Sequence, residues 1–198
     1  GAPEPSPPLV LCENDQARER VDRVLRSEGI LPETPLIGLN PFTFYGSAKR
    51  WLPRRFAAVG QHLAEALNGA VVIAGNQSEH AAAQEVCATV GERARNLSGL
   101  FDLIELVSLL RRMTVFVTND SGAMHMAAAV GIRTVAIFGP MDWVKTAPWS
   151  DNAIVVRHPV ACAPCMLRMC PIDHRCMERV LVADALDAIR RRWPEMGV

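Results

Sequence analysis

The sequence predicts an α/β fold, a doubly wound and mainly parallel Rossmann-like sheet covered by helices. Short apolar runs, typical of buried strands, alternate along the chain with longer segments whose apolar residues recur at helical spacing. The connections between them are short, and parallel neighbouring strands require a crossover helix. Together these two observations favour a parallel sheet over an antiparallel one.

The first 34 residues differ from the rest. Residues 1–8, GAPEPSPP, are proline-rich and typical of a linker. Residues 14–30 have apolar positions at helical spacing, an Asn-Asp start and a Gly stop, which predicts a charged surface helix. We therefore expect 1–34 to form a linker and a surface helix, and 35–198 to form the Rossmann-like domain.

The remaining elements follow in order. The apolar runs predict strands at 35–40, 70–75, 114–120, 133–139 and 152–158. Helical spacing predicts helices at 49–67 with Pro53 near the first turn, at 78–90 with Ser78 as cap, and at 101–113, 121–131 and 182–193. Ligands of such sheets bind beyond the carboxyl ends of the strands. The site is therefore expected in the loops after Asn40, Gly75, Thr118 and Phe138.

Composition limits the function classes. Apolar residues make up 49% of the 198 residues and charged residues 21%, as in ordinary globular proteins. Lys plus Arg and Asp plus Glu both number 21, which argues against nucleic-acid binding. No apolar run is long enough to span a bilayer and no signal peptide opens the chain, so we expect a cytoplasmic protein with reduced thiols. The first residue is Gly, which fits a fragment or a processed product.

The stretch TNDSGAMHMAAA carries the strongest functional signal. Asp120 is well placed to cap the helix that follows its strand, and Ser121, Gly122 and Ala123 expose free backbone N–H groups at the positive end of that helix. Small side chains there allow a phosphate to approach, and His125 shares the same face. The alternative is an ordinary helix cap followed by a core histidine.

Three further stretches offer weaker signals. In NPFTFYGSAKRW, Lys49 could reach an anion at the sheet edge and Thr43 could donate its hydroxyl, although a solvated lysine explains the pattern too. In FGPMDWVKTAPWS, the tryptophans either stack on a ring or pack on the domain edge. In AVVIAGNQSEH, the polar residues either meet a ribose or cap a helix. The candidate residues of FGPMDWVKTAPWS are Asp142, Trp143, Lys145, Thr146 and Trp149. Those of AVVIAGNQSEH are Asn76, Gln77 and Glu79.

Four cysteines lie close together near the C-terminus, with C-x2-C-x4-C-x5-C spacing and two histidines, His158 and His174, nearby. Four thiolates could close a tetrahedral zinc site or hold an iron–sulfur cluster. Buried free thiols and disulfides are the alternatives, because the usual second C-x2-C pair is missing. The candidate ligands are Cys162, Cys165, Cys170 and Cys176, whereas Cys12 and Cys87 are isolated and look like ordinary thiols.

The sequence resembles the ADP-heptose:lipopolysaccharide heptosyltransferases, in particular their heptosyltransferase II branch. The resemblance rests on four runs and on their order: NPFTFYGSAKRW, TNDSGAMHMAAA, FGPMD with TAPW, and CPIDHRCM. The resemblance covers nearly the whole chain after the linker. It implies the C-terminal, nucleotide-sugar-binding half of a glycosyltransferase with two facing Rossmann-like domains. The acceptor contacts and the catalytic base would lie in the other half.

The resemblance also implies roles for individual residues. Thr43 and Lys49 would meet the diphosphate of ADP-heptose, and Lys49 would stabilise the leaving group without a required metal cofactor. The phosphate and sugar side of the pocket would be formed by Asp120, Ser121, Gly122, Ala123 and His125. Phe42 stands where the family usually has Gly, and Met141 where it usually has Thr, so donor contacts in these two loops stay open.

The implied partners are the ADP-heptose donor and the lipopolysaccharide inner core as acceptor, with possible peripheral membrane association at the inner face of the inner membrane. Two rival functions are compatible with this fold class. A nicotinamide-dependent oxidoreductase should have a G-x-G-x-x-G turn after the first strand, and NPFTFYGSAK lacks it. A non-enzymatic nucleotide- or metal-binding module is the other alternative.

Overall fold

The computed structural model describes residues 9–198, so the proline-rich run 1–8 lies outside the described residues. Six strands form one parallel sheet in the order β3-β2-β1-β4-β5-β6. The predicted fold class is confirmed. The strands are β1 Leu36–Asn40, β2 Ala70–Ile73, β3 Ala94–Asn96, β4 Val115–Asn119, β5 Arg133–Phe138 and β6 Ala153–Arg157.

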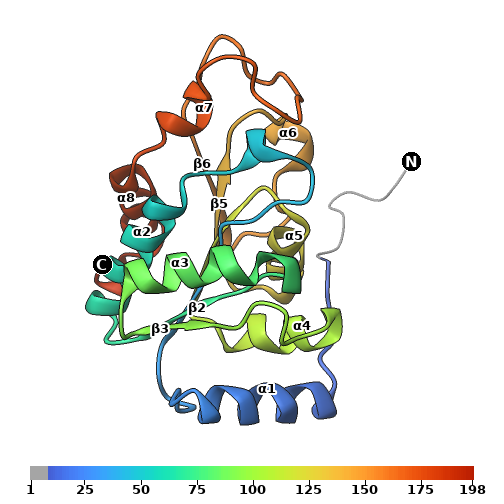
Figure 1. Ribbon diagram of the computed structural model, residues 1–198, viewed down its shortest axis with the longest axis vertical. Helices are drawn as coiled ribbons and strands as arrows, with labels where there is room; N and C mark the ends of the chain where they lie inside the picture. The colour runs from blue at the N-terminus through green and yellow to red at the C-terminus, as the bar shows by residue number, and fades with distance from the viewer. Residues whose placement is uncertain (1–8) are drawn as a thin grey trace.

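Helices connect the strands and cover both faces of the sheet (Figure 1). The longer helices are α1 Asp15–Ser27, α2 Pro53–Ala66, α3 His80–Val90, α4 Leu103–Arg112, α5 Gly122–Val130 and α8 Val182–Arg192. The shorter ones are α6 Trp143–Thr146, α7 Arg175–Glu178, and the 3-10 turns η1 Ser47–Lys49, η2 Gln77–Glu79 and η3 Pro194–Met196.

The alternation of side chains along the strands divides the core into two layers. Ile37 and Val117 belong to the cluster that packs against α2, α3 and α8, whereas Leu36 and Phe116 belong to the cluster that packs against α1 and α4. The face of α1 that carries Val21 and Leu25 is fully buried in this second cluster. The predicted charged surface helix therefore has one face in the core.

The strand order places the binding edge. The chain runs outward from β1 through β2 to β3, returns to the other side of β1 at β4, and continues to β6. The connections that leave β1 and β4 therefore cover opposite faces of the sheet, and a crevice opens between them at the carboxyl ends.

Several local predictions were wrong. The helix expected at 49–67 begins at Pro53, because proline fits the first turn of a helix, and Lys49 instead ends the turn η1. The predicted cap Ser78 lies inside η2, and Asn76 forms the capping box with Glu79. The short elements β3, α6, α7 and η3 were not predicted, because three or four residues carry too little periodicity to recognise.

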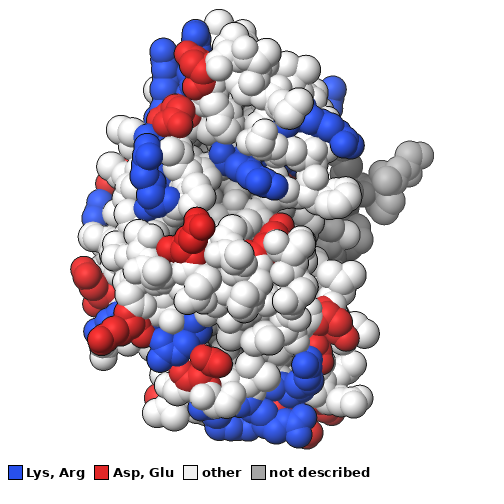
Figure 2. Space-filling model, in the orientation of Figure 1, with Lys and Arg blue, Asp and Glu red and all other residues white. Residues whose placement is uncertain are grey.

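Acidic and basic side chains are interspersed on the face seen in Figure 2 and form no large patch of one sign. This distribution matches the formal net charge of zero. Among the described helices, none has the length and apolar character that a bilayer-spanning segment needs.

Candidate functional site

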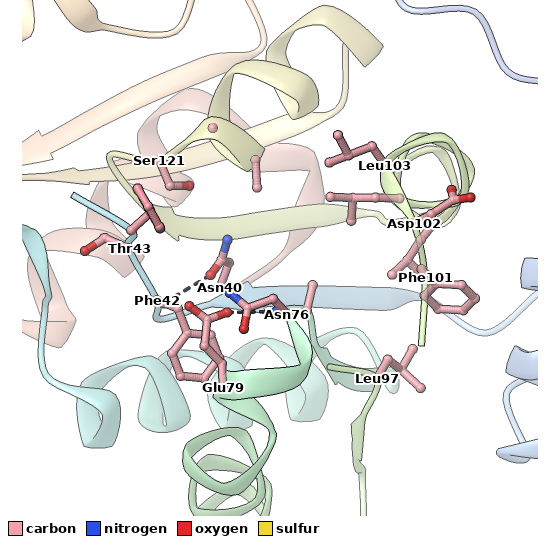
Figure 3. Close-up of a pocket in the computed structure, with 17 residues that line it drawn as sticks. Asn40, Phe42, Thr43, Asn76, Glu79, Leu97, Phe101, Asp102, Leu103 and Ser121 are labelled. Atoms are coloured by element: carbon pink, nitrogen blue, oxygen red, sulfur yellow. Dashed lines mark hydrogen bonds between the residues drawn. The ribbon is translucent and has the colours of Figure 1, made fainter. Parts of the chain in front are cut away.

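A cleft of about 560 Å³ opens at the carboxyl ends of β1, β2 and β4 (Figure 3). Its polar side chains come from the end of β1, from the loops after β1, β2 and β4, from η2 and from the start of α4: Asn40, Thr43, Asn76, Glu79, Asp102 and Ser121. Its apolar wall consists mainly of Leu97, Phe101, Leu103, Leu106 and Leu109. The cleft therefore offers an apolar wall beside a few polar groups, which suits a nucleoside.

A second hollow of about 350 Å³ adjoins this cleft. Thr43, Phe44, Ser121 and Gly122 line both, so the two form one continuous groove. The second hollow is also lined by Tyr45, Lys49, Asp120, His125, Met141 and Thr146. All seven residues predicted to bind the donor line this groove. Thr43, Ser121 and Gly122 line both parts, Lys49, Asp120 and His125 line the second hollow alone, and Ala123 lines the cleft alone.

A buried ion pair lies at the floor of the second hollow. Lys49 Nζ is 2.8 Å from Asp120 Oδ2, and the two side chains are only 10% and 6% exposed. No other polar group of the described chain bonds to Asp120 Oδ2. Lys49 also lies 5.2 Å from the centroid of the Tyr45 ring, which is a cation–π contact. The lysine is therefore held in place before any ligand arrives.

The expected cap of α5 was wrong in detail. Ser121, not Asp120, is the N-cap, and its hydroxyl accepts from the N–H of Met124 at 3.4 Å. Asp120 pairs with Lys49 instead, because its side chain is buried beside that ammonium. The helix still presents its positive end to the groove. Gly122 has no atom within 4 Å of the position that a Cβ would take, so the space in front of it is open.

Other polar side chains shape the loop after β1. The Thr43 hydroxyl donates to Gly46 O at 2.9 Å, so the one proton that was expected for a phosphate here closes its own loop. The buried amide of Asn119 accepts from Trp51 N–H at 2.9 Å and donates to Pro41 O at 2.8 Å. Asn119 thus ties β4 to both ends of this loop. Sequence reasoning missed that role, because nothing local distinguishes a buried amide from a capping residue.

The loop after β5 contributes less than expected. Met141 and Thr146 reach the second hollow, whereas Asp142 caps α6 by accepting from Val144 N–H at 3.2 Å. Trp143 and Trp149 are 40% and 60% exposed, and the guanidinium of Arg157 lies 4.7 Å from the ring centroid of Trp143. Neither tryptophan lines the groove.

Three of the four clustered cysteines lie in the segment between β6 and α7, at the top of Figure 1, and the fourth, Cys176, lies in α7. All four thiols are free; Cys162 and Cys165 are exposed, Cys170 is half-buried and Cys176 is buried. Burial, with a smaller contribution from the charges of the other three cysteines, raises the pKa of Cys176 to about 11. The charges of Cys162, Cys165 and Cys170 thus lie near enough to Cys176 to affect its ionisation. Among residues 9–198, however, no three His, Cys, Asp or Glu side chains converge as metal ligands, so the metal site stays a prediction.

Residues 1–175 match the family model described as glycosyltransferase family 9 (heptosyltransferase). The chain belongs to this family. It is 34% identical over 148 residues to lipooligosaccharide heptosyltransferase 2 of Campylobacter jejuni, a match that covers 72% of this chain and 46% of that protein. The family 9 chain thus spans about half the length of the curated relatives it matches.

Solved structures agree with this membership. The structure of the Escherichia coli ADP-heptose lipopolysaccharide heptosyltransferase II matches with a TM-score of 0.81 and 26% identity, over 100% of this chain and 57% of that one. A family 9 glycosyltransferase from Veillonella parvula has a TM-score of 0.82 at 22% identity, over 98% of this chain and 57% of that one, and supports the fold alone. Membership of a glycosyltransferase family also disfavours the oxidoreductase and the non-enzymatic module.

Proposed function

We propose that this family 9 domain binds ADP-heptose and that, as part of a heptosyltransferase, it delivers the heptose to the inner core of lipopolysaccharide. The observation that best supports this proposal is the Lys49–Asp120 ion pair beside the open N-terminus of α5, in a groove with room for a nucleotide sugar. The names of the relatives support the donor and the acceptor.

The two parts of the groove suggest how the donor lies. The larger cleft would take the adenosine, with its base against the wall formed by Phe101 and Leu103 and with the Glu79 carboxylate available to the ribose hydroxyls. The smaller hollow would take the diphosphate and the heptose, next to Lys49 and His125. The diphosphate would then bridge the two at Ser121 and Gly122, where backbone N–H groups point outward.

The chemistry follows from charge. In the displacement, the bond between the anomeric carbon and the phosphate oxygen breaks and its electron pair stays on the departing ADP. The acceptor hydroxyl forms the new bond and loses its proton to a base. Lys49 and the N-terminus of α5 would stabilise the charge that builds on the leaving phosphate. We propose that these groups suffice without a catalytic metal, and that any metal at the cysteines is structural.

The base and the acceptor contacts are expected in the other half of the enzyme. The acceptor is a lipopolysaccharide precursor, so we place the enzyme in the cytoplasm, at the inner face of the inner membrane, with peripheral association at most. This placement is tested by fractionation of cells that express the tagged full-length protein. Recovery of the protein outside the cytoplasm and inner membrane would contradict it.

Calorimetric titration with ADP, UDP and GDP tests the proposed donor site. We expect saturable binding of ADP and weaker binding of the other two nucleotides. If ADP does not bind, or if all three bind alike, the groove is not an ADP-sugar site.

A second experiment tests the division of labour. Incubated with ADP-heptose and a lipopolysaccharide acceptor, the chain alone should give no product. Transfer needs both substrates held in attack geometry, a contribution of roughly 7–11 kcal/mol in favourable cases. Turnover by this chain without the other half would refute the idea that it serves only as the donor side.

A further inference from the structure

Residues 158–174 between β6 and α7, here called the cysteine segment, contact residues 41–52 between β1 and α2, here called the donor loop. The cysteine segment contains no helix or strand between the end of β6 at Arg157 and the start of α7 at Arg175. Loops of that length without regular structure are uncommon in compact domains and are often functional. Its own side chains do not form a core, because Met166, Leu167, Met169 and Ile172 are all exposed. The conformation of the segment is therefore fixed by its contacts with other parts of the chain.

The segment holds both backbone groups of Ala48, the residue before Lys49. The N–H of Ala48 donates to Arg168 O at 3.0 Å, and its carbonyl lies 2.7 Å from His174 Nε2. A carbonyl can only accept, so His174 carries its proton on Nε2 and donates it. The peptide that leads into Lys49 is thus fixed from two sides by residues more than a hundred positions away.

We propose that His174 is a positioning residue for the donor site, which fixes the peptide at Ala48 and so aims Lys49 at the outer phosphate. This inference rests on the proposed function, since it assigns His174 a part in donor binding. His174 does not line the groove and acts through the backbone. The pairing of Lys49 with Asp120 sets where the ammonium ends, and His174 sets where the side chain begins.

The backbone of His174 is itself fixed by its neighbours. Its φ of 55° lies in the left-handed region, which few residues other than glycine adopt, and its backbone N–H donates to Cys170 Sγ at 3.3 Å. An unusual backbone conformation persists only where the surroundings fix it. Cys170 therefore links the thiol cluster to the donor loop through a single residue.

Gly46 offers an independent way to disturb the same contact. A Cβ at this position would lie 2.2 Å from Arg168 O, so the donor loop and the cysteine segment pack backbone against backbone. The Tyr45 hydroxyl adds a bond to Met166 O at 3.0 Å, and the Arg168 guanidinium lies 5.0 Å from the Tyr45 ring centroid. Any side chain at position 46 has to push the two segments apart.

The test compares His174→Ala and His174→Gln by calorimetry with ADP and AMP. His174→Ala should weaken ADP binding by about fivefold, the equivalent of one hydrogen bond of about 1 kcal/mol, and AMP binding by less than about twofold. His174→Gln should restore most of the ADP affinity, because its amide N–H can donate to Ala48 O. The control is His62→Ala on α2. The His62 ring contacts Arg190, and neither residue lines the groove, so this change should leave both affinities unchanged.

Gly46→Ala should reproduce the selective loss of ADP affinity without the removal of any hydrogen-bonding group. Equal losses for ADP and AMP in His174→Ala, or an unchanged ADP affinity at both positions, overturn the positioning role. A parallel fall of both affinities with the thermal midpoint shows general loosening and overturns it as well. If the unaltered protein binds no ADP, the proposed function itself fails, which distinguishes the two results.

Discussion

Removal of the Lys49 ammonium tests the centre of the proposed donor site. In Lys49→Ala, the hydrogen bond to the outer phosphate of ADP is lost, whereas AMP has no such phosphate to lose. A hydrogen bond to a charged group contributes about 1.5–3 kcal/mol, so ADP affinity should fall roughly 10- to 150-fold and AMP affinity much less. The lysine is only 10% exposed, which favours the upper part of this range because solvent screens little.

The same substitution leaves Asp120 buried without a partner. Loss of one member of a buried ion pair typically costs about 3–5 kcal/mol of folding stability, and the remaining carboxylate would also repel the phosphates. The double variant Lys49→Ala/Asp120→Asn removes this unpaired charge. It should recover most of the unfolding free energy but not the discrimination between ADP and AMP.

Calorimetric titration with both nucleotides gives the affinities, and urea unfolding gives the stabilities. The decisive quantity is the ratio of ADP to AMP affinity in each variant. If Lys49→Ala lowers both affinities equally, Lys49 does not contact the outer phosphate. If the double variant recovers full ADP affinity, the loss came from the unpaired Asp120 and the reasoning about the lysine is refuted.

Three further predictions concern the helix start and the cysteines. Gly122→Val should abolish ADP binding at nearly unchanged stability, since the valine side chain would occupy open space where the phosphate approaches. ADP titration and urea unfolding check this prediction, and undiminished ADP binding refutes it. The pKa of Cys176 is raised to about 11, so only about one Cys176 thiol in a thousand is ionised at pH 8. Cys176 should therefore be alkylated after Cys162 and Cys165, and mass spectrometry of the alkylated protein checks this order. If the four thiols bind metal, elemental analysis of protein purified under reducing conditions should find about one zinc per chain, or iron with cluster absorbance. A metal-free protein would show that they are free thiols. Cys170→Ser, which removes one ligand, is the matched variant and should lose the metal.

The fold was accessible from sequence because its signals repeat. Five of the six strands are apolar runs bounded by turn residues, and the long helices have clear apolar spacing. β3, Ala94–Asn96, was missed because it is an edge strand of three half-buried residues with an arginine at its centre. Its existence depends on pairing with β2, which no local pattern records.

The site was only partly accessible. Small residues at a helix start after a strand identified Ser121 and Gly122, since that chemistry is local. The partner of Asp120 could not be read in the same way, because the Lys49 ammonium reaches it across two neighbouring strands. The apolar wall at Phe101 and Leu103 was missed for a related reason. In sequence it looks like the start of an amphipathic helix, and only the sheet order brings it opposite Asn40.

The pairing of Lys49 with Asp120 also bears on how fast a nucleotide reaches the groove. An ammonium and a carboxylate 2.8 Å apart cancel one another at distances well beyond their separation, and the formal net charge of the chain is zero. An approaching diphosphate is therefore hardly guided by a long-range field, unlike the ligands of strongly basic clefts. Added salt should leave the association rate nearly unchanged, and the strength of the site then lies in how slowly the nucleotide leaves once the ammonium and the helix end are in direct contact with it.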